Sequence, residues 1–157
     1  MLYRVKQFIW AITAPFIPIN EEILNKYLNK EEKILFDKLC TSDKHHSIRV
    51  CKDALNIYSN KTNIDERKLA KIALLHDIGK SEHKLNVIEK SALVVLDRFM
   101  NGKFIKYSNN KKVDLYYNHP KIGLEMLNKF DYDKEFLQVV RYHHNKDKIK
   151  ENKILNI

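Results

Sequence analysis

The chain contains 157 residues, enough for one domain that buries a continuous core without disulfide or metal staples. Its net charge of +9 would suit a phosphate-rich partner, but the lysines are spread along the whole chain, which argues against nucleic-acid binding as the main role. Only three glycines and three prolines are present, which favours helices. Cys40 and Cys51 show neither metal-type spacing nor a secreted disulfide framework, so we expect a cytoplasmic protein.

The N-terminal segment is apolar on one side. The stretch FIWAITAPFIPI (8–19) has some features of a signal peptide, but it is too short to span a bilayer and contains two prolines. We therefore expect no membrane partner. Apolar residues recur at three- and four-residue steps, which predicts a first helix with one face packed on a core. These residues are Leu2, Val5, Ile9, Ile12 and Phe16.

Five further helices are predicted before residue 101. Asn20 resembles an N-cap, followed by acidic residues in a first turn. Two apolar stripes on the third of these five helices predict that it is central: Ile48, Cys51, Leu55 and Tyr58 form one stripe, and His46, Val50, Ala54 and Ile57 form the other. The ranges are 21–29, 31–40, 43–60, a helix that begins at Asp65, and 84–100.

Residues 101–112 are the most loop-like stretch, and two helices follow it. The first covers 118–130 and has Pro120 at its first position, so His119 lies at the entrance of that helix. The second begins at about Asp133. No strand pair is predicted. The expected fold is an all-α, single-domain bundle of about seven or eight helices, with N-terminal helices over 1–40 packed on the rest.

Histidines occupy the ends or the apolar stripes of several predicted helices. A single histidine of this kind is usually an ordinary core or surface residue. Several buried imidazoles together with a carboxylate would cost several kcal/mol in desolvation, whereas a divalent metal satisfies all of them at once. The set comprises His46, His76 with the adjacent Asp77, His119, and the pair His143 and His144.

These motifs, in this order, resemble those of the HD superfamily of metal-dependent phosphohydrolases, in particular its HDIG-type members. The segments that carry the resemblance are HSIRV at His46, HDIGK at His76, HPKIG at His119 and the final HH. The resemblance covers about residues 43–146. The family fold is an all-helical bundle, in agreement with the periodicity.

The resemblance implies two metal ions. His46, His76 and Asp77 would bind one ion, Asp77 would bridge to a second, and His119, His143 and His144 would complete the second coordination shell. Imidazole-rich ligation suits iron, manganese or zinc better than magnesium or calcium, and we favour iron or manganese, with zinc, magnesium and nickel left open. Two such ions can hold a hydroxide in line with a phosphorus atom, so that no side-chain nucleophile is required.

Other residues near these motifs suggest how a phosphate would be held. Lys80 would bind a substrate phosphate, as the family's lysine does, or is a solvated surface residue. Asp77 and Lys80 are thus the expected catalytic residues. Arg49 and Arg141 would clamp a phosphate or form ion pairs. Gly79 would allow close approach of the backbone to the metals or substrate, or would only end a helix.

Two residues beside the first motif have open roles. Asp43 precedes His46 by about one turn, and it either caps the helix or orients a ligand histidine. His45 points about 100° away from His46 on a helix, which indicates a surface residue or one that supports the ligands.

The chain also departs from the family pattern. Family members carry a further aspartate after the last histidine, and here only Asp147 is available. Either Asp147 substitutes for it, or solvent fills the position, or the natural chain continues, which we prefer. The GYP segment of the cyclic-di-GMP phosphodiesterase branch is missing, since the chain has HHNKDKIK. Loss of an anionic ligand would weaken the first metal.

The function expected is cleavage of a phosphomonoester or phosphodiester by a metal-bound hydroxide. The substrate would be a phosphorylated small molecule, in particular a nucleotide or a nucleotide-derived signal. The alternative is a non-catalytic regulatory module on the same fold that binds a metal or a nucleotide. Retention of all six metal-type residues favours the enzyme, while the absent last aspartate favours the module.

Overall fold

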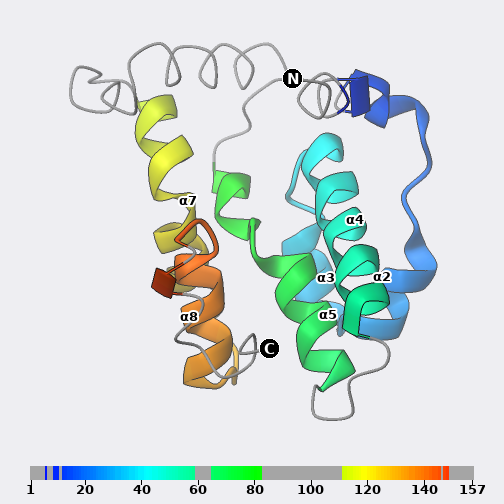
Figure 1. Cartoon of the computed structure of the whole chain (residues 1–157). Coiled ribbons are helices and arrows are strands. Elements are labelled where there is room, and N and C mark those ends of the chain that lie inside the picture. Colours follow the sequence, from blue (N-terminus) through cyan, green and yellow to red (C-terminus); the bar gives the residue numbers. More distant parts are fainter. Residues whose placement is uncertain are drawn as a thin grey trace.

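The computed structural model describes residues 6, 9–10, 12–58, 65–82, 111–145 and 147–148. Within these ranges the chain forms six α-helices and two 3-10 helices and contains no strand (Figure 1), which confirms the all-α prediction. The predicted helix over 84–100 and most of the 101–112 stretch lie outside the described residues. The elements are η1 (Ala14–Phe16), α2 (Glu21–Tyr27), α3 (Lys30–Phe36), α4 (Thr41–Tyr58), α5 (Glu66–Leu75), η2 (Ile78–Glu82), α7 (Lys111–Leu127) and α8 (Lys134–Tyr142).

Four helices begin at a side-chain cap, three of them at residues where the sequence predicts a helix start. In each case an Asn or Asp side chain accepts a hydrogen bond from the backbone N–H three residues later, which satisfies one of the free donors of the first turn. The caps of α2, α3, α5 and α8 are Asn20, Asn29, Asp65 and Asp133. Local hydrogen bonds therefore set where these helices start.

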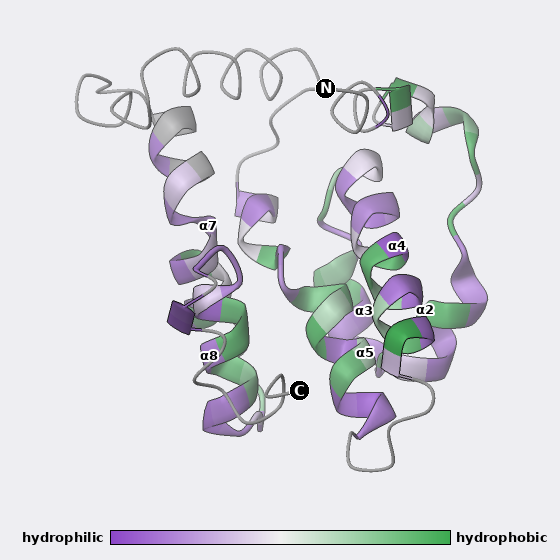
Figure 2. Ribbon diagram, viewed as in Figure 1, coloured by the Kyte–Doolittle hydropathy of each residue, from purple (hydrophilic) through white to green (hydrophobic). Residues whose placement is uncertain are grey.

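The most buried helix is α5, and not α4 as the two stripes predict. Residues 72–75 of α5 are all buried, so that this helix meets neighbours on every side. On α4, Ile48 and Cys51 are buried but Ile57 of the second stripe is exposed. Val50 and Ala54 of the second stripe are only partly buried, so α4 packs into the core mainly through its first stripe. Figure 2 shows the mixture of apolar and hydrophilic residues on these helices that such one-sided burial requires.

The prediction that the N-terminal stripe packs on a core is wrong for the residues that can be described. Ile9, Ile12 and Phe16 are 47%, 46% and 86% exposed. Instead, the buried residue of this segment is Ala14, in the short 3-10 helix η1, which packs against α4. The 3-10 turn with Pro15 changes the helical period after Thr13, so Phe16 no longer shares a face with Ile9 and Ile12. Leu2 and Val5 lie outside the described residues. Among those described, no helix is both long and apolar enough to cross a bilayer.

Pro120 lies inside α7, and the prediction that it starts a helix is wrong. The helix begins at Lys111, so His119 is in its interior and not at its entrance. An interior proline removes one backbone hydrogen bond and costs about 3 kcal/mol. The packing of α7 against η2 and α8 supplies tertiary contacts that outweigh this loss.

A buried carboxylate ties α3 to the segment that leads into α8. Glu32 accepts hydrogen bonds from Lys71 Nζ at 2.6 Å and from Tyr132 Oη at 2.5 Å, and its other oxygen accepts the Asn29 N–H at 2.7 Å. Burial by itself raises the pKa of Glu32, but Lys71, Tyr132 and the Asn29 amide outweigh it and lower this pKa. The carboxylate thus joins α3, α5 and the α7–α8 connection in one network.

Replacement of Glu32 by Ala is expected to lower the free energy of unfolding by about 3 kcal/mol, because it leaves the buried ends of Lys71 and Tyr132 without their acceptor. Urea denaturation followed by circular dichroism measures this loss. The matched control is Glu31→Ala, an exposed neighbour in the same first turn, which should change stability by less than about 0.5 kcal/mol. Equal effects of the two changes would show that the network does not hold α3 in place.

Candidate metal centre

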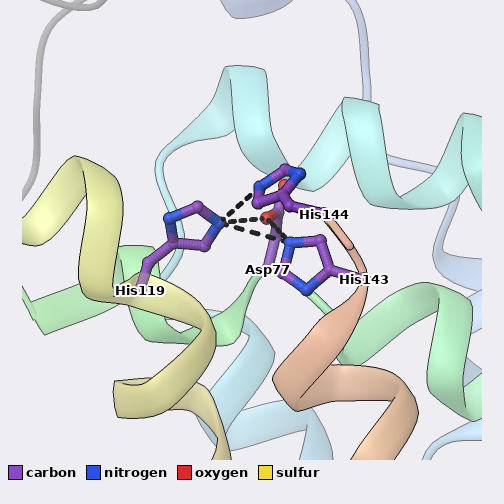
Figure 3. A group of neighbouring side chains, drawn as sticks. All are labelled: Asp77, His119, His143 and His144. Carbon is purple, nitrogen blue, oxygen red and sulfur yellow. Dashed lines mark hydrogen bonds and ion pairs between the residues drawn. The ribbon is translucent and has the colours of Figure 1, made fainter. Parts of the chain in front are cut away.

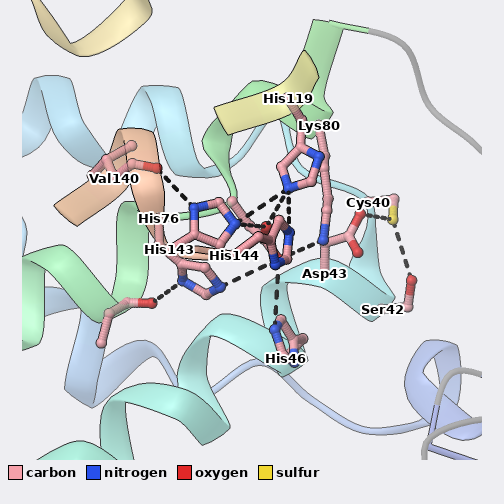
Figure 4. Close-up of polar contacts among 12 residues, drawn as sticks. Cys40, Ser42, Asp43, His46, His76, Lys80, His119, Val140, His143 and His144 are labelled. Atoms are coloured by element: carbon pink, nitrogen blue, oxygen red, sulfur yellow. Dashed lines mark hydrogen bonds and ion pairs between the residues drawn. The ribbon is translucent and has the colours of Figure 1, made fainter. Parts of the chain in front are cut away.

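Two helices end in the same arrangement at the centre of the molecule. His76 is the C-cap of α5 and His143 is the C-cap of α8. The Nδ1 of each lies near the carbonyl oxygen three residues before it, at 2.8 Å from Ala73 O and at 2.7 Å from Val140 O (Figure 4). A carbonyl oxygen can only accept, so each Nδ1 carries the proton and donates it. In the neutral form of each ring the Nε2 atom therefore keeps its lone pair, which is the form that binds a metal.

The Asp77 carboxylate is 1% exposed and follows the first of these caps. Its Oδ2 atom lies 3.4 Å from His76 Nε2 and 3.5 Å from His46 Nε2. His46 projects from α4 and is the more open of the two imidazoles, with a side chain that is 38% exposed. His46, His76 and Asp77 Oδ2 thus form one group of donors, the first group, whose ligand atoms all lie within 4.8 Å of one another.

The other oxygen of Asp77 faces a second group of imidazoles (Figure 3). Asp77 Oδ1 lies 3.2 Å from His119 Nε2 and 3.5 Å from His143 Nε2. His119 Nε2 is also 3.3 Å from His143 Nε2 and 3.1 Å from His144 Nε2. Asp77, His119, His143 and His144 form this second group, again with all ligand atoms within 4.8 Å of one another. Helices α7 and α8 and the end of α5 meet here.

The spacing of these atoms fits divalent cations better than hydrogen bonds. Within the described residues, Asp77 Oδ1 is buried and accepts no hydrogen bond, although two imidazole nitrogens approach it. Because His143 Nδ1 carries the proton, its Nε2 has none to share with His119 while the ring is neutral. Around a metal with ligands at about 2.1 Å, neighbouring donor atoms are about 3.0–3.4 Å apart, close to the separations found. A cation in each group would satisfy both the orphaned oxygen and the lone pairs.

The electrostatics of the centre favour the metal-binding forms of its residues. Burial lowers the pKa of His46 to about 4, and burial together with His143 and His119 lowers the pKa of His144 to about 4. Both imidazoles are therefore neutral at neutral pH. Burial by itself raises the pKa of Asp77, but Lys80 and the surrounding imidazoles outweigh it and hold this pKa well below its usual value. The carboxylate is ionised, as a metal ligand needs to be.

The dipoles of two helices also contribute to the electrostatics of the centre. The C-termini of α5 and α8 both point into the centre through their caps. The C-terminal end of a helix carries a partial negative charge and stabilises cations near it. Burial alone lowers the pKa of His76, yet its pKa is raised, because the Asp77 carboxylate and the Ala73 carbonyl outweigh burial. The two helix C-termini and the Asp77 carboxylate thus favour a cation close to His76.

The predicted phosphate-binding residues are not equally close to the centre. Lys80 Nζ lies 2.6 Å from Asp77 Oδ2, on the side of the first group, and its side chain is partly exposed. The Arg49 guanidinium lies 4.4 Å from the centre of the Trp10 ring, and that of Arg141 lies 5.7 Å from the centre of the Tyr142 ring. Lys80 thus contacts a residue of the centre directly.

Predictions for three further residues need correction or remain open. Asp43 does not cap α4, which begins at Thr41. It is buried in the first turn and accepts a hydrogen bond from Cys40 Sγ at 2.9 Å. His45 is not a surface residue, since it is buried with its Nε2 3.1 Å from Ile17 O. Asp147 is exposed and belongs to neither group of donors.

The sequence analysis did not predict the hydrogen bond between Cys40 and Asp43. The spacing of three residues, at a helix start, is the signal that would have found it, because residues three apart at a helix start face each other. The negative charge of Asp43 acts on His46 and partly offsets the effect of burial on its pKa. Asp43 thus belongs to the surroundings of the first group.

Comparison with known proteins agrees with this geometry. The family model of the HD domain matches residues 44–157, a range that contains all six donor residues. No curated protein and no solved structure matches the chain. Since the family model covers more than half of the sequence, and its range begins at α4 and includes the imidazole–carboxylate centre, the chain belongs to the HD domain family.

Proposed function

We propose that this protein is a metal-dependent phosphohydrolase that cleaves a phosphomonoester or a phosphodiester. The HD domain family is generally one of metal-dependent hydrolases. The observation that carries the proposal is the buried Asp77 carboxylate, whose two oxygens each face a separate group of imidazole nitrogens. A carboxylate that faces two ligand groups is the arrangement needed to bridge two metals a few ångströms apart.

The six residues would hold two divalent cations. His46 and His76 would bind the first, His119, His143 and His144 the second, and Asp77 both. Five imidazoles and one carboxylate suit iron, manganese or zinc, and we favour iron or manganese. When bound, two such cations would supply Lewis acidity and a nucleophilic water for attack on phosphorus.

Lys80 is proposed to bind the phosphate of the substrate. Its ammonium group is already held beside Asp77 Oδ2, and its side chain is open enough for a ligand to reach it. A lysine in this place adds positive charge where negative charge builds on the phosphoryl oxygens. Arg49 and Arg141 are proposed to clamp the phosphate or to form ion pairs, and each guanidinium also lies over an aromatic ring.

A nucleotide or a nucleotide-derived signal is the substrate class proposed. The net charge of +9 raises the local concentration of phosphorylated small molecules around the protein. We also propose that the protein works in the cytoplasm as one domain. Neither Cys40 nor Cys51 forms a disulfide in the described part of the chain, which suits a reducing compartment.

A second candidate function is a regulatory module that binds a metal or nucleotide without turnover. One observation favours it. Among the described residues the first group has three donors, one of which, His46, has a side chain that is 38% exposed, and Asp147 does not join it. A weakly held first metal would leave a binding site without full catalytic power.

The deciding experiment combines metal analysis with a phosphate-release screen. Protein purified without chelator is expected to contain iron or manganese and to hydrolyse at least one of p-nitrophenyl phosphate, bis-p-nitrophenyl phosphate, nucleoside monophosphates or cyclic nucleotides. Prior treatment with EDTA should abolish the activity, and Mn²⁺ should restore it. Bound metal and a bound nucleotide without hydrolysis would favour the regulatory module. Protein that takes up no divalent metal and binds no nucleotide would contradict both candidates.

A further inference from the structure

The backbone of η2 touches the backbone of α7 at one glycine. A Cβ atom placed on Gly79 would lie 2.0 Å from the carbonyl oxygen of His119 and 2.6 Å from the backbone nitrogen of Gly123. Real Cβ atoms essentially never come within 3.0 Å of other heavy atoms, and backbone atoms cannot rotate away as a side chain can. Any side chain at residue 79 therefore requires η2 and α7 to separate by about 1 Å or more.

The backbone contact at Gly79 lies close to Asp77 and His119, two ligand residues of the second group. Asp77 is two residues before Gly79, and the oxygen that the added Cβ would meet is that of His119 itself. The Asp77 Oδ1 to His119 Nε2 distance is 3.2 Å. A ligand centre tolerates displacements of only about 0.5 Å, so a separation of the two backbones would move His119 out of reach of a metal held by Asp77.

The first group is placed by different elements. His46 comes from α4, and His76 is held by its hydrogen bond to Ala73 within α5. They are joined by the extensive packing of α4 on α5, whereas η2 packs mainly on α7. A change in the η2–α7 distance should therefore leave His46 and His76 in place relative to Asp77.

We infer that Gly79 is a positioning residue whose lack of a side chain sets the distance between Asp77 and His119 and so selectively sets the affinity of the second metal. Gly79 touches no ligand side chain in this role and acts through the backbone of α7. Gly123 is the facing partner, but it is less restricted. A Cβ there would lie 3.3 Å from Gly79 N and 3.5 Å from side-chain carbons of Ile78 and Val140.

The test is Gly79→Ala, with two readouts. The first is the imidazole NMR spectrum of chelator-treated protein, in which the ring signals of His119 should move while those of His46 stay. The second is calorimetric titration with Zn²⁺, in which one of the two ions should lose about tenfold to 100-fold in affinity and the other should stay within about threefold. Gly123→Ala should shift the same signals in the same direction but less.

The control is Phe36→Leu, a change to a fully buried side chain of α3 that lowers stability without touching the η2–α7 contact. It should lower the melting temperature and leave the His119 signals and both Zn²⁺ affinities unchanged. If Gly79→Ala does not fold, Gly123→Ala and Gly123→Val form a graded series for the same readouts. Unchanged His119 signals, or equal loss of both ions, in the folded variants would overturn the inference.

The inference rests on the proposed function for its metal readout but not for its NMR readout. If the unaltered protein takes up no divalent metal, the proposed function fails, while the His119 signals still decide whether Gly79 positions that ring. If the unaltered protein binds two ions and Gly79→Ala keeps both, the inference fails and the proposed function stands.

Discussion

Replacement of Asp77 by Asn is expected to remove both metals and to reduce phosphate release by about 10³-fold or more. Asn is nearly the same size, but it has one acceptor oxygen, no charge and an NH₂ group that would face one of the imidazole groups. The loss of several kcal/mol of charge stabilisation corresponds to a rate loss of that size. Metal content by mass spectrometry and steady-state phosphate release on the best substrate of the screen measure the two effects.

The matched control is Asp147→Asn. Asp147 is an exposed carboxylate that follows His144 by three residues in the sequence, and it belongs to neither donor group. Its replacement should leave metal content and activity within about twofold of the unaltered protein, an informal limit for a surface change. An Asp77→Asn protein that keeps two metals would refute the bridging role of this carboxylate. Loss of metal in both variants would show that Asp147 supplies the anionic ligand that family members carry after the last histidine.

Removal of residues 1–40 is expected to unfold the protein, although the HD family model begins only at residue 44. Helices α2 and α3 and the turn after them contribute buried apolar side chains to the same core as α5 and α8. Each large side chain buried in this way contributes about 1.5–3 kcal/mol, against a total stability of about 5–15 kcal/mol for a typical domain. The residues concerned are Leu24, Tyr27, Leu28, Leu35, Phe36 and Leu39.

Thermal denaturation followed by circular dichroism measures this effect on the fragment 41–157. The matched control is the fragment 13–157, which loses the exposed Ile9 and Ile12 but keeps Ala14 and the buried helices. It should melt cooperatively within a few degrees of the full chain. A cooperative transition in the 41–157 fragment would show that α2 and α3 are not part of the folding unit that carries the metal centre.

Helix starts were predictable because their causes are local. Asn20, Asp65 and Asp133 each bond to a backbone N–H three residues away, and no other part of the chain is needed for that bond. The ends of α5 and α8 are similar. His76 and His143 each bond a carbonyl three residues back, so that adjacent residues can leave the helix with their side chains on one centre.

The errors concern residues whose environment is decided by distant parts of the chain. Pro120 is an acceptable first residue of a helix, and only the packing of α7 on η2 and α8 keeps it in a helix interior. Phe16 fits an amphipathic stripe, but the 3-10 turn at its end leaves it exposed. His45 finds its partner at Ile17, which no helical period relates to it.

The sequence by itself determined the all-helical class, the places where most helices begin, and the identity of the six residues that meet at the centre. These follow from short-range hydrogen bonds, from periodicity and from side-chain chemistry. Only the tertiary structure decided that Asp77 presents one oxygen to each group and that Gly79 lies against the carbonyl of His119. The distances between α4, α5, α7 and α8 depend on how the side chains of these helices pack against one another. That packing depends on all residues of the core together, and not on any short segment of the sequence.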